Sequence, residues 1–599
     1  MMFKIKFLFF YFVMNSLLFS IENKYGILVN GGVAPLNPIM QQKFAMNLNG
    51  EVIINNLDLG QAFLSLILCD GLTDQQYLKN CSNNINSLAD NKDLFTFDNN
   101  TSVQNFIENS TQNSGVVGAK FDYIEYTSPG YSSTNSIANL PTENLSGLVV
   151  LPTDGKGNIL PVSKIKGILI YYHGTIPSKN GVPSGLNNQD SVDFFQTFIY
   201  QYIVSSIFVS SGYIVISPDY IGQGMDFKTM HPYAFETTQN ALSGIYMLKA
   251  TNEYLLSKYN FGFKDMINNK LFISSYSEGG GYALKATKIL DSNQDIILNK
   301  LNLKLVKTYG VSGAYDVSNT MIDFMYDNVD TNYNDNINKW NAIPGCAQSG
   351  PDLCINEANG QDLAVVKYYT ANAKPVLSIF LATSFNYYYN EVLPLSNFLD
   401  ADVITLQSCI DLNNSLTQNQ WLRVNCNTLF GQFNTVTDLF MSPKVDAMQV
   451  SLELNSVAMA NKFLIGPSSN FNNLSQLLAI SGNNYNSVLY FSPKTGVISP
   501  IFQKVVQKGN SYHFTTTTPV EILSLRYDSE VPNRNSEIAC DNLKGIHVSG
   551  NGSISCKQLD NTKMWSMNSY FGNNYVSYLI HEDAEPIFDI HEVQDMNNY

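Results

Sequence analysis

The order of apolar and polar positions predicts alternating strands and helices in the middle of the chain. Residues 121–126 alternate in the manner of a half-buried strand. Short apolar runs, typical of strands buried on both faces, follow at residues 146–152, 166–172, 213–218, 270–274 and 303–308. Residues 240–256 are predicted to form a helix between two of these runs. This alternation predicts an α/β fold, with a mostly parallel sheet flanked by helices.

The alternation stops after residue 308 and resumes near the end of the chain. Residues 321–511 contain aromatic and Leu-rich helical patterns separated by Asn-rich turns. A segment of that length is too long to be a structureless loop in a compact protein. We therefore expect a large, mainly helical cap domain inserted into the sheet domain. Strand patterns return at residues 518–525 and 575–580.

These patterns divide the chain into five parts. No chemistry can be assigned to the N-terminal extension. The parts are a signal peptide at 1–20, the N-terminal extension at 21–117, the first part of the core at 118–320, the cap or lid at 321–511, and the second part of the core at 512–599.

The N-terminus has the features of an export signal. Lys4 and Lys6 precede an almost unbroken apolar run over residues 7–19, and Ser20 offers a small residue for cleavage. The alternative is an uncleaved anchor, but the run is shorter than the roughly 20 residues that span a bilayer. We expect a cleaved signal and export to the periplasm or the extracellular medium.

The cysteines also indicate export. The chain has eight, which fall in couples close in sequence, with no CxxC or His-rich metal pattern. An even number in local couples is typical of short disulfides formed in an oxidising compartment. The expected bridges are Cys69–Cys81, Cys346–Cys354, Cys409–Cys426 and Cys540–Cys556.

Composition narrows the range of partners. Charged residues make up only 14% of the chain, and 35 basic against 50 acidic residues give a net charge of −15. No run of Lys or Arg occurs, which argues against a nucleic-acid partner. We interpret the acidity as a contribution to solubility. The oligomeric state is not determined by these features.

One short motif carries the chemistry. Ser275-Tyr276-Ser277-Glu278-Gly279 follows a predicted buried strand and precedes a helix-favouring run. It resembles the nucleophile elbow, G-x-S-x-G, of the α/β-hydrolase superfamily, in particular its secreted bacterial esterases and lipases. The first small residue here is Ser275 in place of Gly. The resemblance implies an α/β-hydrolase fold with Ser277 as nucleophile.

The same resemblance implies an acid and a histidine, in that order along the chain. Asp528 follows the predicted strand that ends near residue 525 and is the preferred acid. Glu530 in the same turn and Asp316 after an earlier strand remain alternatives. His581 follows the last predicted strand and is preferred over His591 as the catalytic base. A helix led by Pro586 is expected after it.

The segment after the strand at 166–172 resembles the family's oxyanion-hole loop. It reads His173-Gly174-Thr175, and the implied donors are the N–H groups of Thr175, with Ile176 as an alternative, and of Glu278. His173 itself is expected to order the loop. Two further matches, a turn over residues 218–224 and His231-Pro232-Tyr233, are interpreted as structural.

The resemblance implies a carboxylic ester hydrolase, an esterase or lipase that forms an acyl-enzyme without metal or cofactor. The substrate would be a small-molecule or lipid ester, which leaves room for a transient contact with a membrane surface. The alternatives are a peptidase or an acyltransferase on the same fold, which would use the same residues, or a catalytically silent binding protein.

Overall fold

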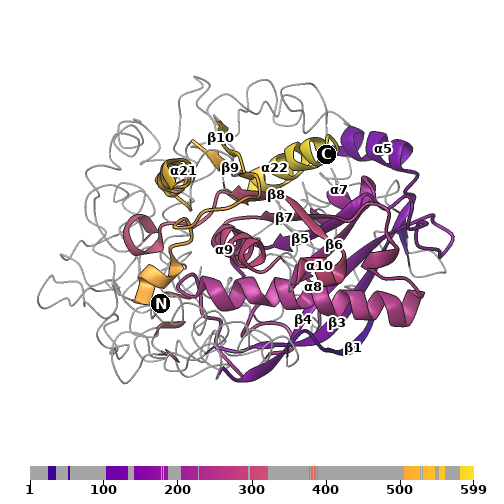
Figure 1. Ribbon diagram of the computed structural model, residues 1–599, viewed down its shortest axis with the longest axis horizontal. Coiled ribbons are helices and arrows are strands. Elements are labelled where there is room, and N and C mark those ends of the chain that lie inside the picture. The colour runs from indigo at the N-terminus through magenta and orange to yellow at the C-terminus, as the bar shows by residue number, and fades with distance from the viewer. Residues whose placement is uncertain are drawn as a thin grey trace, which may run out of the picture.

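A computed structural model of the chain shows one twisted sheet with helices on both faces (Figure 1). The structure describes residues 25–34, 51–53, 103–131, 140–176, 179, 181–186, 204–226, 228–294, 297–321, 377, 380–381, 384–385, 387–388, 505–526, 528, 530–546, 552–559 and 581–599.

The described strands form a ten-stranded sheet in the order β1-β3-β4-β6-β5-β7-β8-β9-β10, with β2 also paired to β3. Neighbours from β6 to β10 run parallel, whereas β1 to β4 pair antiparallel, as do β4 and β6. The strands are β1 (Leu28–Val33), β2 (Val52–Ile53), β3 (Gly118–Pro129), β4 (Thr142–Thr153), β5 (Gly167–Tyr172), β6 (Tyr213–Pro218), β7 (Lys270–Ser275), β8 (Lys304–Val311), β9 (Val520–Leu525) and β10 (Ile554–Leu559).

Two layers of helices cover the sheet (Figure 1). On one face α8 packs against β3 and α9, and α21 joins a cluster of buried side chains that includes Leu284 of α9. On the other face α5 and α22 pack against α7. The helices are α5 (Val103–Ser114), α7 (Ser205–Ser210), α8 (Thr237–Tyr259), α9 (Glu278–Ser292), α10 (Leu298–Leu301), α21 (Arg534–Ile546) and α22 (His581–Met596).

The expected α/β fold is confirmed, and the apolar runs explain it. Every residue of β5, β6 and β9 is buried, as continuous apolar strands between two helical layers should be. The long helix α8 ends before Asn260, which caps it in the left-handed conformation, φ 57°. Of the N-terminal extension, β1 and β2 extend the sheet at its antiparallel edge.

Three features differ from the sequence expectation or lie beyond it. Strand β10 was not predicted, and its residues are half-buried or exposed. The helix after the last predicted strand begins at His581 itself and holds Pro586 in its interior, so the expectation of a Pro-led helix was wrong. The predicted strand at 575–580, the signal peptide and most of the cap lie outside the described residues.

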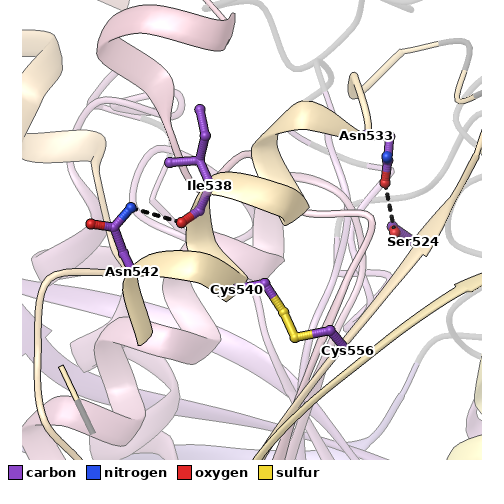
Figure 2. Close-up of a disulfide and its surroundings, with 6 residues drawn as sticks. All are labelled: Ser524, Asn533, Ile538, Cys540, Asn542 and Cys556. Carbon is purple, nitrogen blue, oxygen red and sulfur yellow. Dashed lines mark hydrogen bonds between the residues drawn. A yellow bond between two sulfur atoms is a disulfide. The ribbon is translucent and has the colours of Figure 1, made fainter. Parts of the chain in front are cut away.

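A disulfide joins α21 to β10 (Figure 2). It links Cys540 to Cys556, with Cα atoms 6.4 Å apart, as the local spacing predicted. Figure 2 also shows the hydroxyl of Ser524, near the end of β9, donating to the side-chain oxygen of Asn533 at 2.9 Å. The hydrogen bond closes the turn that connects β9 to α21, and the disulfide ties α21 to β10. The other three expected bridges lie outside the described residues.

In the part of the chain that is described, no helix has both the length and the apolar character needed to cross a bilayer.

Helix α22 turns a row of carboxyl groups toward the interior. Glu585, Asp589 and Glu592 are buried, and their spacing places them on one face of the helix. Tyr171 of β5 donates a hydrogen bond to Glu585. Burial, with the neighbouring carboxylates, raises the pKa of both Asp589 and Glu592 well above the ordinary range.

Glu521 of β9 has the opposite environment. Lys307 of β8 donates to it at 2.5 Å, and Lys557 and His591 lie 2.7 and 3.5 Å away. Burial alone raises the pKa of Glu521, but these partners outweigh burial and hold it well below 4.5. The contributions of the Glu592 and Glu521 carboxyl groups to stability therefore change with pH in opposite directions.

We predict that Glu592→Gln stabilises the protein progressively as the pH rises. A carboxyl with a raised folded-state pKa contributes most below its unfolded pKa, about 4.3, and that contribution is lost toward neutral pH. The amide cannot ionise, so the gain over the natural chain should reach at least about 1 kcal/mol by pH 8. Thermal melts at pH 4, 6 and 8 measure it.

Glu521→Gln is the matched control. Because the pKa of Glu521 is strongly depressed, this variant should be less stable than the natural chain by a nearly constant amount at all three pH values, and should approach it only in acid well below pH 4. A constant effect of Glu592→Gln at all three pH values would contradict the assignment of a disfavoured carboxylate.

Candidate active site

Ser277 lies at a sharp turn between β7 and α9. Its backbone has φ 53° and ψ −122°, a conformation that costs energy in a residue with a side chain. Two hydrogen bonds hold the turn: the N–H of Tyr276 donates to Tyr172 of β5 at 3.0 Å, and that of Ser277 to Val311 of β8 at 3.0 Å. A strained serine between a buried strand and a helix is the geometry of the nucleophile elbow.

The small residues on either side of Ser277 have different roles. A Cβ on Gly279 would lie 2.1 Å from the carbonyl oxygen of Tyr172, so only glycine allows α9 to start this close to β5. Ser275, where the family pattern has glycine, is buried, and its hydroxyl donates to the carbonyl of Tyr309 at 2.9 Å. The departure from G-x-S-x-G is therefore accommodated by a hydrogen bond to β8.

Asp528 and His581 are joined by a hydrogen bond. His581 Nδ1 lies 2.9 Å from Asp528 Oδ2, and both residues are 2% exposed. Asp528 Oδ1 accepts from the N–H groups of Glu530 and Val531 at 2.9 and 2.8 Å, which fixes the carboxylate in its turn. Because a carboxylate only accepts, the proton is assigned to Nδ1, and Nε2 is the basic nitrogen of the neutral imidazole.

Tyr276 brings this pair to the elbow. Its ring centroid lies 4.9 Å from that of His581, and its hydroxyl donates to the backbone carbonyl of His581. Tyr276 immediately precedes Ser277, so the acid–histidine pair packs on the residue next to the strained serine. No local pattern indicates this contact, because the residue before the serine is unrestricted in the motif.

The alternative acids have other partners. Asp316 accepts from the Thr320 hydroxyl and from the Tyr512 hydroxyl, both at 2.9 Å, and so holds the π-helical turn Val317–Met321 against the core. The backbone N–H of Glu530 donates to Asp528, as described above, so Glu530 belongs to the same turn.

The alternative histidines also lie elsewhere. His591 contacts Lys557 at 3.2 Å and Glu521 at 3.5 Å, on the last turns of α22. His513 packs its ring on Tyr512, 4.2 Å between centroids, and is exposed. His547 lies outside the described residues.

The loop after β5 holds the other expected donor. Thr175 is half-buried, and its hydroxyl lies 3.2 Å from that of Tyr233. His173 is buried, donates from Nδ1 to the carbonyl of Gly174 at 2.7 Å, and stacks on Tyr220 at 4.0 Å. Burial lowers the pKa of His173 to about 3, so it is neutral near pH 7 and orders the loop.

Glu278 begins α9, so its N–H belongs to the first turn, whose N–H groups have no partner within the helix. Its side chain was missed by the sequence reasoning, which used only this N–H. The carboxylate is buried and lies 2.6 Å from Nε2 of His231, and Tyr282 also donates to it. The signal available in the sequence was the presence of a charged residue, Glu278, between Ser277 and Gly279.

The turn over residues 218–224 is held by hydrogen bonds to neighbouring elements. Asp219 accepts from the hydroxyl of Ser146 at 2.5 Å and from the N–H of Ser184 at 3.1 Å. Burial raises the pKa of Asp219 to about 6, while these hydrogen bonds act in the opposite direction. The turn ties β4, β6 and the loop after β5 together.

No set of three or more His, Cys, Asp or Glu side chains within the described ranges is arranged to hold a metal ion.

Comparisons with known proteins give only distant likenesses. No family model matches the chain, and no curated protein matches it. Solved structures, among them the following three, are similar to most of it. A protein from Legionella pneumophila, described as a candidate hydrolase, is 16% identical, with 83% of this chain and 95% of that chain covered and a TM-score of 0.43.

The second is the rice cell wall degrading esterase LipA from Xanthomonas oryzae, which is 15% identical, with 82% and 93% covered and a TM-score of 0.44. The third is Candida antarctica lipase A in its closed state, which is 13% identical, with 76% and 73% covered and a TM-score of 0.36.

We predict that Gly279→Ala destabilises the protein by at least about 3 kcal/mol, because the new methyl meets the rigid carbonyl of Tyr172. Denaturant unfolding measures the loss. Gly281→Ala, two residues on in the same helix, is the control: the nearest atom to its Cβ is 3.3 Å away, so stability should change by less than about 1 kcal/mol. Equal effects of the two substitutions would disprove the close-packing argument.

Proposed function

We propose that the protein is a serine hydrolase that cleaves carboxylic esters, an esterase or lipase, with Ser277, Asp528 and His581 as its triad. The observation that carries the proposal is the buried hydrogen bond between Asp528 and His581, which packs on Tyr276, the residue directly before the strained backbone of Ser277. A serine, a base and an acid that orients the base form the minimal machinery for acyl transfer.

In the first half of the reaction, His581 takes the proton of the Ser277 hydroxyl as its oxygen attacks the ester carbonyl. Asp528 holds the imidazole in the required tautomer and stabilises the imidazolium. The N–H groups of Thr175 and Glu278 would bind the oxyanion. The intermediate expels the alcohol, which takes the proton from His581. Water then attacks the acyl-enzyme with His581 as base, and His581 returns the proton to the Ser277 oxygen as the acid is released.

Residues of the proposed cap pack on the segment that leads into α8. Phe380 is buried and stacks on Tyr233 at 4.5 Å, and Tyr388 donates to the carbonyl of Met230 and packs on Tyr131 at 4.4 Å. Since Tyr233 also contacts Thr175, the cap is connected to the loop that carries an oxyanion donor. We infer that residues 321–511 govern access to the site, and that the acyl group is apolar.

We also propose that the protein is exported. The disulfide between Cys540 and Cys556 is of a kind that persists in oxidising compartments, and the basic and apolar pattern of the first 20 residues is that of a signal peptide.

A peptidase or an acyltransferase would use the same triad, and the product of the reaction separates these alternatives from an esterase.

We predict that Ser277→Ala lowers the hydrolysis of p-nitrophenyl esters by roughly 10⁴-fold or more and abolishes labelling by a fluorophosphonate probe. Folding should be preserved, because alanine removes only the hydroxyl. Ser275→Ala is the control: it loses one hydrogen bond, to Tyr309, and should keep its activity. If Ser275→Ala lost activity and labelling and Ser277→Ala kept them, Ser275 would be the nucleophile and the assignment would be refuted.

We predict that Asp528→Asn lowers kcat by roughly 10³- to 10⁴-fold with little change in KM, because the amide no longer selects the tautomer of His581. Steady-state kinetics on the same esters measure the change. Asp316→Asn, which alters the contacts to Thr320 and Tyr512, should affect stability more than kcat. The reverse outcome would assign the acid to Asp316.

A further inference from the structure

Glu278 places a carboxyl group where negative charge is least favourable. Its backbone N–H is one of the two proposed oxyanion donors, and the residue is only 4% exposed. A carboxylate at this position opposes the negative charge that develops in the transition state, and low exposure strengthens the repulsion. The site can work only if this group is neutralised.

His231 supplies the proton that neutralises it. Its Nδ1 lies 2.9 Å from the carbonyl of Ile221, and a carbonyl only accepts, so Nδ1 carries a proton. Its Nε2 lies 2.6 Å from Glu278 Oε1, a distance that requires one shared proton. Whichever atom holds this proton, the pair of side chains has no net charge.

The imidazole is held in this orientation by the residues around it. The ring of Tyr220 stacks on His231, 5.6 Å between centroids and 14° between planes, and Phe380 of the cap lies 5.9 Å away. A Cβ on Gly222 would lie 2.3 Å from the backbone N of His231, so the glycine in this turn allows the close approach. The ring can therefore not turn away from Glu278 without repacking.

Glu278 also acts on Tyr233, whose hydroxyl contacts that of Thr175. Burial, followed by a negative charge on Glu278, raises the pKa of Tyr233 well above its ordinary value. The carboxyl therefore lies close enough to influence the residue that contacts Thr175, which carries the second proposed donor.

We propose that His231 is a positioning residue of this site: by sharing a proton with Glu278 it keeps the elbow electrically neutral and holds the N–H of Glu278 on the oxyanion. The inference rests on the function proposed above. It gives a defined contribution to the reaction to His231-Pro232-Tyr233, which the sequence analysis interpreted only as structural.

The test is a double-mutant cycle on His231 and Glu278. His231→Gln keeps a donor but has no proton to give, so kcat for p-nitrophenyl esters should fall by roughly 30- to 300-fold with KM changed by less than about 3-fold. Adding Glu278→Gln removes the negative charge and should recover at least about 10-fold of the lost kcat. A merely structural histidine predicts that the double variant is no better than His231→Gln.

His591→Gln is the matched control, because it removes another histidine–carboxylate contact, to Glu521, outside the site. It should stay within about 2-fold of the natural kcat. A trifluoromethyl ketone, which forms an anionic adduct with the serine, gives a second measurement: its Ki should rise in the same proportion as kcat falls in His231→Gln and recover in the double variant.

The outcomes separate the two proposals. Activity that survives Ser277→Ala overturns the proposed function and this inference with it. Unchanged kcat in His231→Gln, or no recovery in the double variant, overturns the inference alone. If His231→Gln does not fold, the double variant is compared with Glu278→Gln: the inference expects similar kcat, and a double variant more than about 10-fold slower overturns it.

Discussion

The close packing of α9 on the end of β5 is the constraint on which the site depends. Gly279 lies against the carbonyl of Tyr172, and no larger residue would allow the helix to begin there. Because the chain must turn from β7 into α9 over so short a distance, Ser277 takes a strained backbone conformation. The same packing places the first-turn N–H groups of α9 beside the loop that follows β5. Strain at one residue thus orders both the proposed nucleophile and its oxyanion donors.

Much of the fold could be predicted because the parallel strands are continuous apolar runs, a pattern that few other structures share. Strand β10 could not, since Ile554–Leu559 is half-exposed and includes Lys557 and Gln558, which favour no particular element. Its pairing with β9 depends on long-range contacts that a local pattern does not encode.

The candidate site was predictable in its residue types but not in its partners. Asp316, Asp528 and Glu530 all follow strands, and only the hydrogen bonds distinguish them: Asp316 is bound by Thr320 and Tyr512, whereas Asp528 is bound by His581. The pairing of Glu278 with His231 was beyond the sequence, because it joins residues 47 positions apart. A motif predicts where the backbone turns, whereas the contacts of each side chain depend on residues that are distant in the sequence.

The bridge between Cys540 and Cys556 has a consequence for how copies of the chain can associate. Strand β10 is the last strand in the described sheet, and terminal strands are the elements most readily exchanged between molecules. A covalent bond from β10 to α21 prevents β10 from being exchanged on its own, because that exchange would require the bond to be reduced first. In the oxidised chain the edge strand and its covering helix can therefore leave the sheet only as one unit.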